Sequence, residues 1–153
     1  MTPSSATGPV GVSAPDRRLR MLVNATVGLI GLEFLLGVAV NLWVQKLPAN
    51  LGDLFGPSAG SYSPLLAAHA GLGVLVGLVS LATLILAYGA RPRALAVGCG
   101  VGFAAVLVAA IGGEGYLASA GQAAYSFVMA VGFLGAFWAY SWVRIALARA
   151  AAP

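Results

Sequence analysis

The sequence predicts an all-α membrane protein in which four transmembrane helices run up, down, up and down. Sixty per cent of the residues are hydrophobic, 8% are charged, and the mean hydropathy is +0.94. These values lie far outside the range of soluble domains. Four apolar stretches approach or exceed the length needed to cross the roughly 30 Å hydrocarbon layer of a bilayer. The predicted spans cover about residues 21–44, 64–88, 94–111 and 121–143.

Residues 1–18 are predicted to be a disordered tail in front of a transmembrane domain of residues 19–149. The first 16 residues are rich in Pro, Ser, Thr and Gly and show no apolar periodicity, as in chains that cannot bury enough apolar surface to fold. A cleavable signal peptide is not indicated, because the apolar run that follows is too long and contains Glu33.

The first span carries a single carboxylate, Glu33, close to its middle. An ionised carboxylate at that depth costs on the order of 3 kcal/mol, so it should face protein or water and not lipid. The helical period places a polar and small stripe on the same face, which we expect to point inward. Its members are Thr26, Glu33, Gly37 and Asn41. Glu33 is interpreted either as a proton or cation site, or as a neutral acid that joins neighbouring helices by a hydrogen bond.

A long outer loop, residues 45–63, connects the first two spans. Loops of this length often act as lids or binding loops, but they also occur as passive connectors. Within it, the segment LPANLGDLF predicts a short interfacial helix.

Each remaining span has one face of polar or small residues, which we expect to point into the bundle. In the second span this face holds His69, Gly73, Gly77, Ser80 and Thr83, and the leucines on the other side should meet lipid. In the third it holds Gly98, Gly102, Ala105, Ala109 and Gly112, followed by a predicted glycine-rich loop that exposes Glu114. In the fourth it holds Gln122, Tyr125, Met129, Gly132, Ala136 and Ala139.

The basic residues predict the orientation. All seven arginines fall on the side of the N-terminus if there are four spans, and Lys46 alone falls opposite. This excess predicts that both termini are cytoplasmic. The arginine preference, with many Ala, Gly and Val residues, suggests a bacterial genome of high GC content, and hence a bacterial plasma membrane. The basic residues flank spans and form no single patch, so nucleic acid is not an expected partner.

A candidate ligand site is predicted in the outer half of the bundle. Counting residues along antiparallel helices places His69, Asn41 and Tyr125 at nearly the same depth. Glu33 is expected about 8 Å deeper, too far for direct contact with His69 but within reach of a water chain. His69 is interpreted as a haem or metal ligand, as a proton relay, or as a neutral imidazole hydrogen-bonded to Asn41 or Tyr125. One His, one Cys (Cys99) and a few separated acids make no tetrahedral metal set.

Two segments resemble a known family. LEFLLGVAVNLW followed by AAHAGLGVLVGL is similar to one four-helix half of the haem A synthase type of membrane protein. The resemblance implies that His69 is an axial haem ligand. The family supplies a second histidine from the fourth helix, where this chain reads GQAAYSF. Haem would then need a second protomer, another ligand or a five-coordinate iron.

Glu33 also gives the chain a likeness to the small multidrug resistance transporters. These are four-span proteins with one membrane-embedded Glu in the first helix. The outer loop of residues 45–63 and the longer chain depart from that pattern.

Three functional classes remain open from the sequence. The chain is expected to be a small redox subunit associated with haem or quinone, a dimeric proton-coupled transporter of a small solute using Glu33, or an accessory or assembly subunit. No catalytic set or phosphate loop is present in the sequence, so a non-enzymatic role is favoured. The expected partners are the bilayer and either a second copy of the chain or a larger membrane complex.

Overall fold

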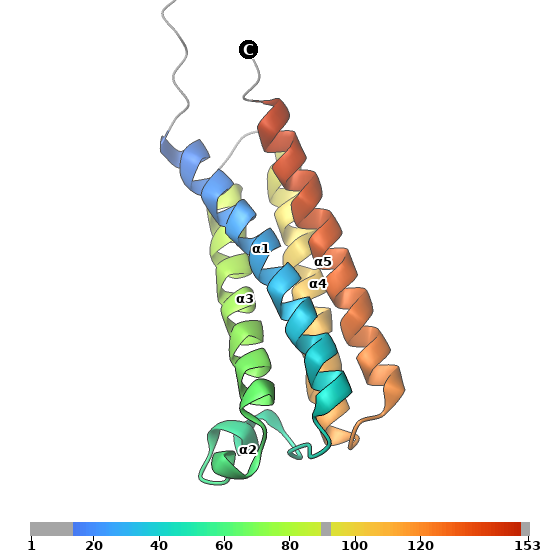
Figure 1. The fold of residues 1–153 in the computed structure, drawn as a ribbon. Helices are drawn as coiled ribbons and strands as arrows, with labels where there is room; N and C mark the ends of the chain where they lie inside the picture. The colour runs from blue at the N-terminus through green and yellow to red at the C-terminus, as the bar shows by residue number, and fades with distance from the viewer. Residues whose placement is uncertain (1–13, 90–92, 151–153) are drawn as a thin grey trace, which may run out of the picture.

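The structure is a computed structural model that describes residues 14–89 and 93–150. All regular structure in these residues is helical: α1 (Ala14–Trp43), α2 (Leu51–Phe55), the 3-10 turn η1 (Ala59–Ser61), α3 (Pro64–Tyr88), α4 (Arg93–Ala118) and α5 (Ala123–Arg149). Helices α1, α3, α4 and α5 are long and apolar enough to cross a membrane. The predicted four-helix, multi-pass membrane fold is therefore confirmed. Both ends of the described chain lie at one end of the bundle, and α2 lies at the other, which we call the loop end (Figure 1).

The helix boundaries differ from the predicted ones at several ends. Helix α1 begins at Ala14, inside the segment predicted to be a tail, of which residues 1–13 lie outside the described chain. Helix α5 continues to Arg149. The outer loop contains the predicted short helix as α2, which begins where the Asn50 side chain accepts a hydrogen bond from the backbone N–H of Asp53.

The predicted glycine-rich loop after the third span is wrong, because α4 runs through it to Ala118. A Cβ at Gly112 would lie 2.6 Å from the backbone nitrogen of Met129. This glycine therefore permits close helix packing and does not make a turn. The chain turns later, at Ala120 and Gly121, whose φ angles are 54° and 95°. Glycine suits such left-handed backbone because it lacks a Cβ.

Helices α4 and α5 pack most closely, through the small residues predicted for this contact. A Cβ at Gly132 would lie 2.5 Å from the backbone nitrogen of Ala109 and 2.8 Å from the carbonyl oxygen of Ala105. The two backbones are therefore nearly in contact. Such small-residue packing joins transmembrane helices where lipid removes the hydrophobic drive for association.

The end of the bundle that carries the termini is closed by a buried tyrosine. The ring of Tyr140 on α5 lies against Gly102 of α4. Its hydroxyl donates to the carbonyl oxygens of Ser80 on α3 and Cys99 on α4, each at 3.4 Å. At the same end, Arg20 of α1 donates to the carbonyl oxygen of Leu147 on α5 at 3.2 Å. Tyr140 thus connects α3, α4 and α5, and Arg20 joins α1 to α5.

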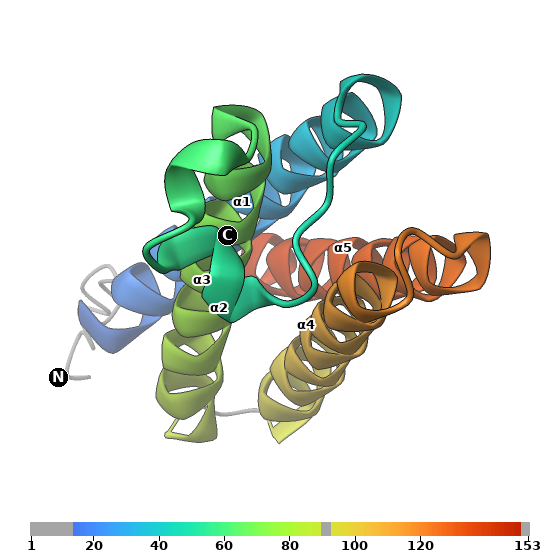
Figure 2. The same ribbon diagram turned by 90° about the horizontal axis from the view of Figure 1, so that it is seen from below.

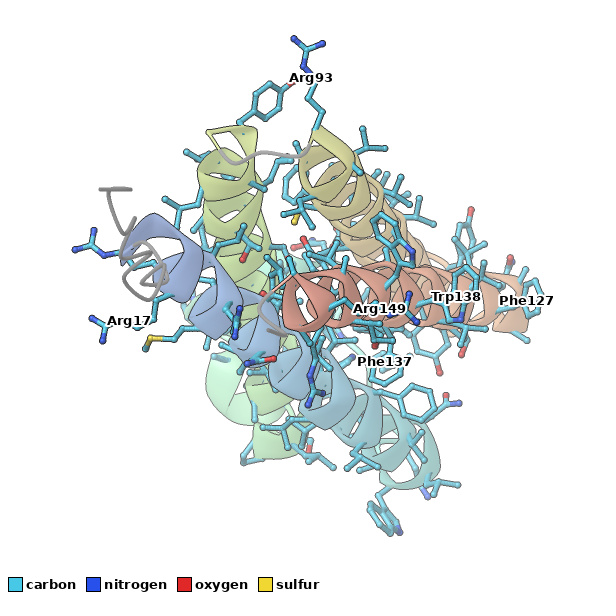
Figure 3. The ribbon with its side chains drawn as sticks, turned by 90° about the horizontal axis from the view of Figure 1, so that it is seen from above. Arg17, Arg93, Phe127, Phe137, Trp138 and Arg149 are labelled. Carbon is cyan, nitrogen blue, oxygen red and sulfur yellow. The ribbon has the colours of Figure 1, made fainter. Side chains whose placement is uncertain are left out.

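At the loop end the four long helices separate into two pairs. Seen from below, the ends of α1 and α3 lie apart from those of α4 and α5 (Figure 2). On the outside, Phe127 and Trp138 project from α5, away from the bundle (Figure 3). The leucines predicted to meet lipid on α3 are exposed, as expected for a membrane-facing side. Arg17, Arg93 and Arg149 are at the end that carries the termini (Figure 3).

Replacing Gly132 by Ala should destabilise the bundle. The added Cβ meets backbone atoms of α4, which cannot move aside, so we expect a loss of about 1–3 kcal/mol, as for overpacking of a tight core. Thermal or denaturant unfolding in detergent would measure it. The control is Gly31→Ala, at a helical glycine whose Cβ would meet nothing within 4 Å. An unchanged stability of Gly132→Ala would contradict the close α4–α5 contact.

Candidate functional site

A carboxylate and an imidazole meet inside the bundle. Oε1 of Glu33 on α1 lies 3.0 Å from Nδ1 of His69 on α3. Glu33 is 2% exposed and the His69 side chain 12% exposed. Glu33 is therefore sheltered from lipid, as its position in the span predicts. We call these two residues the Glu33–His69 pair.

The prediction that Glu33 lies too far from His69 for direct contact is wrong. Glu33 lies opposite Gly73 of α3, and His69 lies opposite Gly37 of α1. The two side chains thus occupy adjacent layers, one helical turn apart. Counting residues gave the separation of the backbones along the membrane normal, but two long side chains extend toward each other across that turn.

Two glycines make this contact possible. A Cβ at Gly37 would lie 3.1 Å from Cε1 of His69, and a Cβ at Gly73 would lie 2.9 Å from Oε1 of Glu33. Each helix therefore carries one ionisable side chain and, four residues later, the glycine that receives the partner's side chain. The motif is Glu-xxx-Gly on α1 and His-xxx-Gly on α3, antiparallel to each other.

The pair is not fully satisfied by protein groups. Although Nδ1 and Oε1 are 3.0 Å apart, the ring N–H is not aligned with the oxygen well enough to form a hydrogen bond. The other carboxylate oxygen, Oε2, is buried and has no hydrogen-bond partner among the described residues. Buried polar groups normally have partners. An unpartnered buried oxygen therefore points to a group from outside the chain or to water.

A cavity of about 420 Å³ lies beside the pair. Its volume falls within the roughly 300–1,000 Å³ of pockets that hold small molecules. All four long helices line it, and α2 adds Leu51 and Leu54. Most of the lining is apolar, and the polar exceptions are Glu33, Asn41, His69, Glu114, Tyr116 and Ser126. An apolar cavity with a few convergent polar groups is the usual form of a ligand site.

The charge of the cavity limits what it can bind. Glu33 and Glu114 are acidic, and none of the described residues that line the cavity is Lys or Arg. An anionic ligand would find no opposite charge there. A neutral ligand with a hydrogen-bond donor, or a cation with an apolar body, suits the cavity better.

The structure places two of the three predicted ligand-site residues at the cavity. His69 and Asn41 line it, whereas Tyr125 does not: its ring packs against Gly115 of α4. Asn41 accepts a hydrogen bond from the Tyr116 hydroxyl at 3.3 Å. His69 thus meets Glu33, and neither Asn41 nor Tyr125 is its hydrogen-bond partner.

Tyr116 is the cavity residue that the sequence analysis missed. It follows the stretch predicted to be a loop, and a loop has no helical period that would place Tyr116 on a face. The signal was present, because the small-residue stripe Ala105, Ala109 and Gly112 continues with helical spacing to Tyr116.

No group of three or more potential metal ligands occurs in the described parts of the chain. No family model matches the chain, and neither a curated protein nor a solved structure is significantly similar to it. The resemblance to the haem A synthase type stays a prediction, and function has to be argued from the site.

Gly73→Ala should separate the pair without breaking the helix. The added Cβ would lie 2.9 Å from Oε1, which is too close, and the carboxylate can move away because it ends a flexible side chain. The chain has one histidine, so the ring ¹⁵N resonances of labelled protein report on His69 alone. We expect both nitrogens to shift in Gly73→Ala. In the control Gly77→Ala, one turn along α3, the Cβ meets nothing within 4 Å, and the resonances should stay. Identical spectra for Gly73→Ala and the unsubstituted protein would contradict the contact.

Proposed function

We propose that the protein is a small redox-associated membrane subunit whose cavity binds a quinone against the Glu33–His69 pair. The observation that carries the proposal is the position of this pair, buried at the wall of an apolar cavity of about 420 Å³. We further propose that the chain works in a bacterial plasma membrane with both termini cytoplasmic. The arginines at the end that carries the termini support this orientation.

The hydrogen-bonding groups of the pair match the two forms of a quinone. A quinone carbonyl accepts a hydrogen bond, which the ring of His69 can donate. A hydroquinone hydroxyl donates one, which Oε2 of Glu33 can accept, since no described residue occupies it. The quinone ring itself is apolar and uncharged, as the rest of the lining requires. Because a quinone exchanges electrons with another centre, we propose that the chain acts within a larger membrane complex or as a homodimer.

Haem is the second ligand of the same redox class. A histidine that binds a metal through Nε2 usually donates its Nδ1–H to a carboxylate or carbonyl oxygen. Oε1 of Glu33 lies 3.0 Å from Nδ1 of His69, and a small rotation of the ring would form this hydrogen bond. The acidic character of the cavity weighs against haem, because no lysine or arginine among the described lining residues can pair with its propionates. An absorbance scan of purified protein distinguishes the two ligands. A Soret band that disappears in His69→Ala would show that the cavity binds haem and not quinone.

Quinone binding should depend on both members of the pair. Equilibrium binding of a short-chain benzoquinone and a short-chain naphthoquinone to purified protein would measure it. We expect Glu33→Gln and His69→Ala each to weaken binding on the order of tenfold, the effect of losing one hydrogen bond. Asp53→Asn makes the same acid-to-amide change on α2, outside the cavity, and should bind normally. The proposal would be refuted if neither quinone bound saturably, or if neither substitution changed the affinity.

A proton-coupled transporter is the second candidate function. It is favoured by one observation, the unpartnered and buried Oε2 of Glu33 at a cavity without basic residues among its described lining. A proton and a cationic solute would compete for this oxygen. In vesicles with an imposed pH gradient, uptake of tetraphenylphosphonium, an apolar cation, should then be lost in Glu33→Gln and kept in Asp53→Asn. Uptake that survives Glu33→Gln would exclude a transport mechanism using this carboxylate.

A further inference from the structure

We infer that water reaches the Glu33–His69 pair through the cavity from the loop side of the membrane only. The half of the bundle on the other side of the pair is closed to water. The functional meaning of this route rests on the proposed function, since it decides which compartment exchanges protons with the ligand site. The route itself depends on the packing of the helices and not on which ligand is bound.

Polar side chains line the cavity at successive turns from the loop end inward. Nearest the loop end, the Tyr116 hydroxyl donates to Asn41 at 3.3 Å, between α4 and α1. One turn deeper on α1, Gly37 receives the ring of His69. One further turn deeper is Glu33. A water molecule needs two to four polar partners to be held in a cavity, and neighbouring levels of this series supply them together.

The series ends at Glu33. Toward the end that carries the termini, the hydroxyls of Thr26 and Thr83 lie 3.3 Å apart and both residues are 0% exposed. Each hydroxyl also donates to the carbonyl oxygen four residues earlier in its own helix. Between this threonine contact and the pair, at the level of Ser80, Tyr140 fills the space between α3, α4 and α5. None of these three side chains lines the cavity, so the described residues leave no second path to the pair.

The charge of the route favours protons and cations. Glu114 stands near the loop end of α4 and Glu33 at the inner end of the series, and His69 lies between them. The described lining residues include no Lys or Arg. Two carboxylates along a narrow path in low-dielectric surroundings concentrate positive charge and repel anions.

The competing possibility is that the cavity communicates only with lipid. Several apolar lining residues are also exposed on the outside of the bundle, among them Phe34 and Val38 of α1 and Val74 of α3. An apolar ligand can enter between helices by this side. Water cannot, because hydrocarbon surrounds it. The two routes therefore predict different reactivities for a thiol placed at the inner end of the cavity.

Three single cysteines on α3 test the inference, each in a Cys99→Ala background so that no other thiol is present. Gly77→Cys places a thiol in the cavity, where a Cβ meets nothing within 4 Å. Leu78→Cys places it on the lipid-facing side at the same depth, and Ser80→Cys in the closed half. Proteoliposomes are treated with a charged, membrane-impermeant methanethiosulfonate from either side. Marker cysteines at Gln45 and Ala150 identify the two sides, and unfolding midpoints confirm that each variant is folded.

We expect Gly77→Cys to react from the loop side on the order of tenfold faster than both controls, because thiols in apolar surroundings are poorly ionised and react slowly. Reagent on the other side should not react with it. Two results would overturn the inference: reaction of Gly77→Cys from the side of the termini, or reaction with a lipid-soluble maleimide alone. If quinone binding still depends on Glu33 in that case, the proposed function stands and only the route is wrong.

Discussion

The need to shelter one carboxylate in the middle of a membrane-spanning helix determines how this bundle is built. Glu33 is only 2% exposed. An isolated charge in such a buried position within a membrane would be strongly unfavourable. His69 on the adjacent helix α3 provides a polar neighbour, with its Nδ1 3.0 Å from Oε1 of Glu33. Gly37 and Gly73 provide the space for this contact, because any Cβ at either position would crowd the partner's side chain. Two polar and two small residues therefore form one unit, and none of the four can be understood without the others.

The same requirement divides the bundle into two halves. On the side of the termini, the ring of Tyr140 packs against Gly102 of α4, and its hydroxyl connects three helices. At the loop end α1 and α3 separate from α4 and α5 (Figure 2), and the cavity beside the pair is lined by all four of these helices. A bundle packed equally along its whole length would have closed over Glu33 and left it no access to ligand or water.

The sequence predicts which face of each helix points into the bundle, because faces in contact with lipid are apolar whereas inward faces carry polar and small residues. The inward positions of Thr26, Ser80 and Thr83 follow from the helical period, and all three are buried. The period places a residue on a face but says nothing about how far its side chain extends, so the contact between Glu33 and His69 was missed. Glycine is ambiguous in another way: the run around Gly112 has the composition of a loop, yet it serves as a packing surface inside α4. Only the position of the neighbouring helix separates these two uses.

The geometry of the pair also bears on whether it merely joins two helices. A buried ion pair is often no more stabilising than apolar residues of the same volume, because both groups lose their water. A purely structural acid would be expected to have both oxygens satisfied, as the hydroxyls of Thr26 and Thr83 are. Glu33 instead keeps Oε2 without a partner among the described residues, next to a cavity. Nδ1 of His69, Nε of Arg20 and Oγ of Ser80 also lack hydrogen-bond partners among the described residues. Of these groups, only the two members of the Glu33–His69 pair line the cavity, where a ligand, water or a proton can reach them.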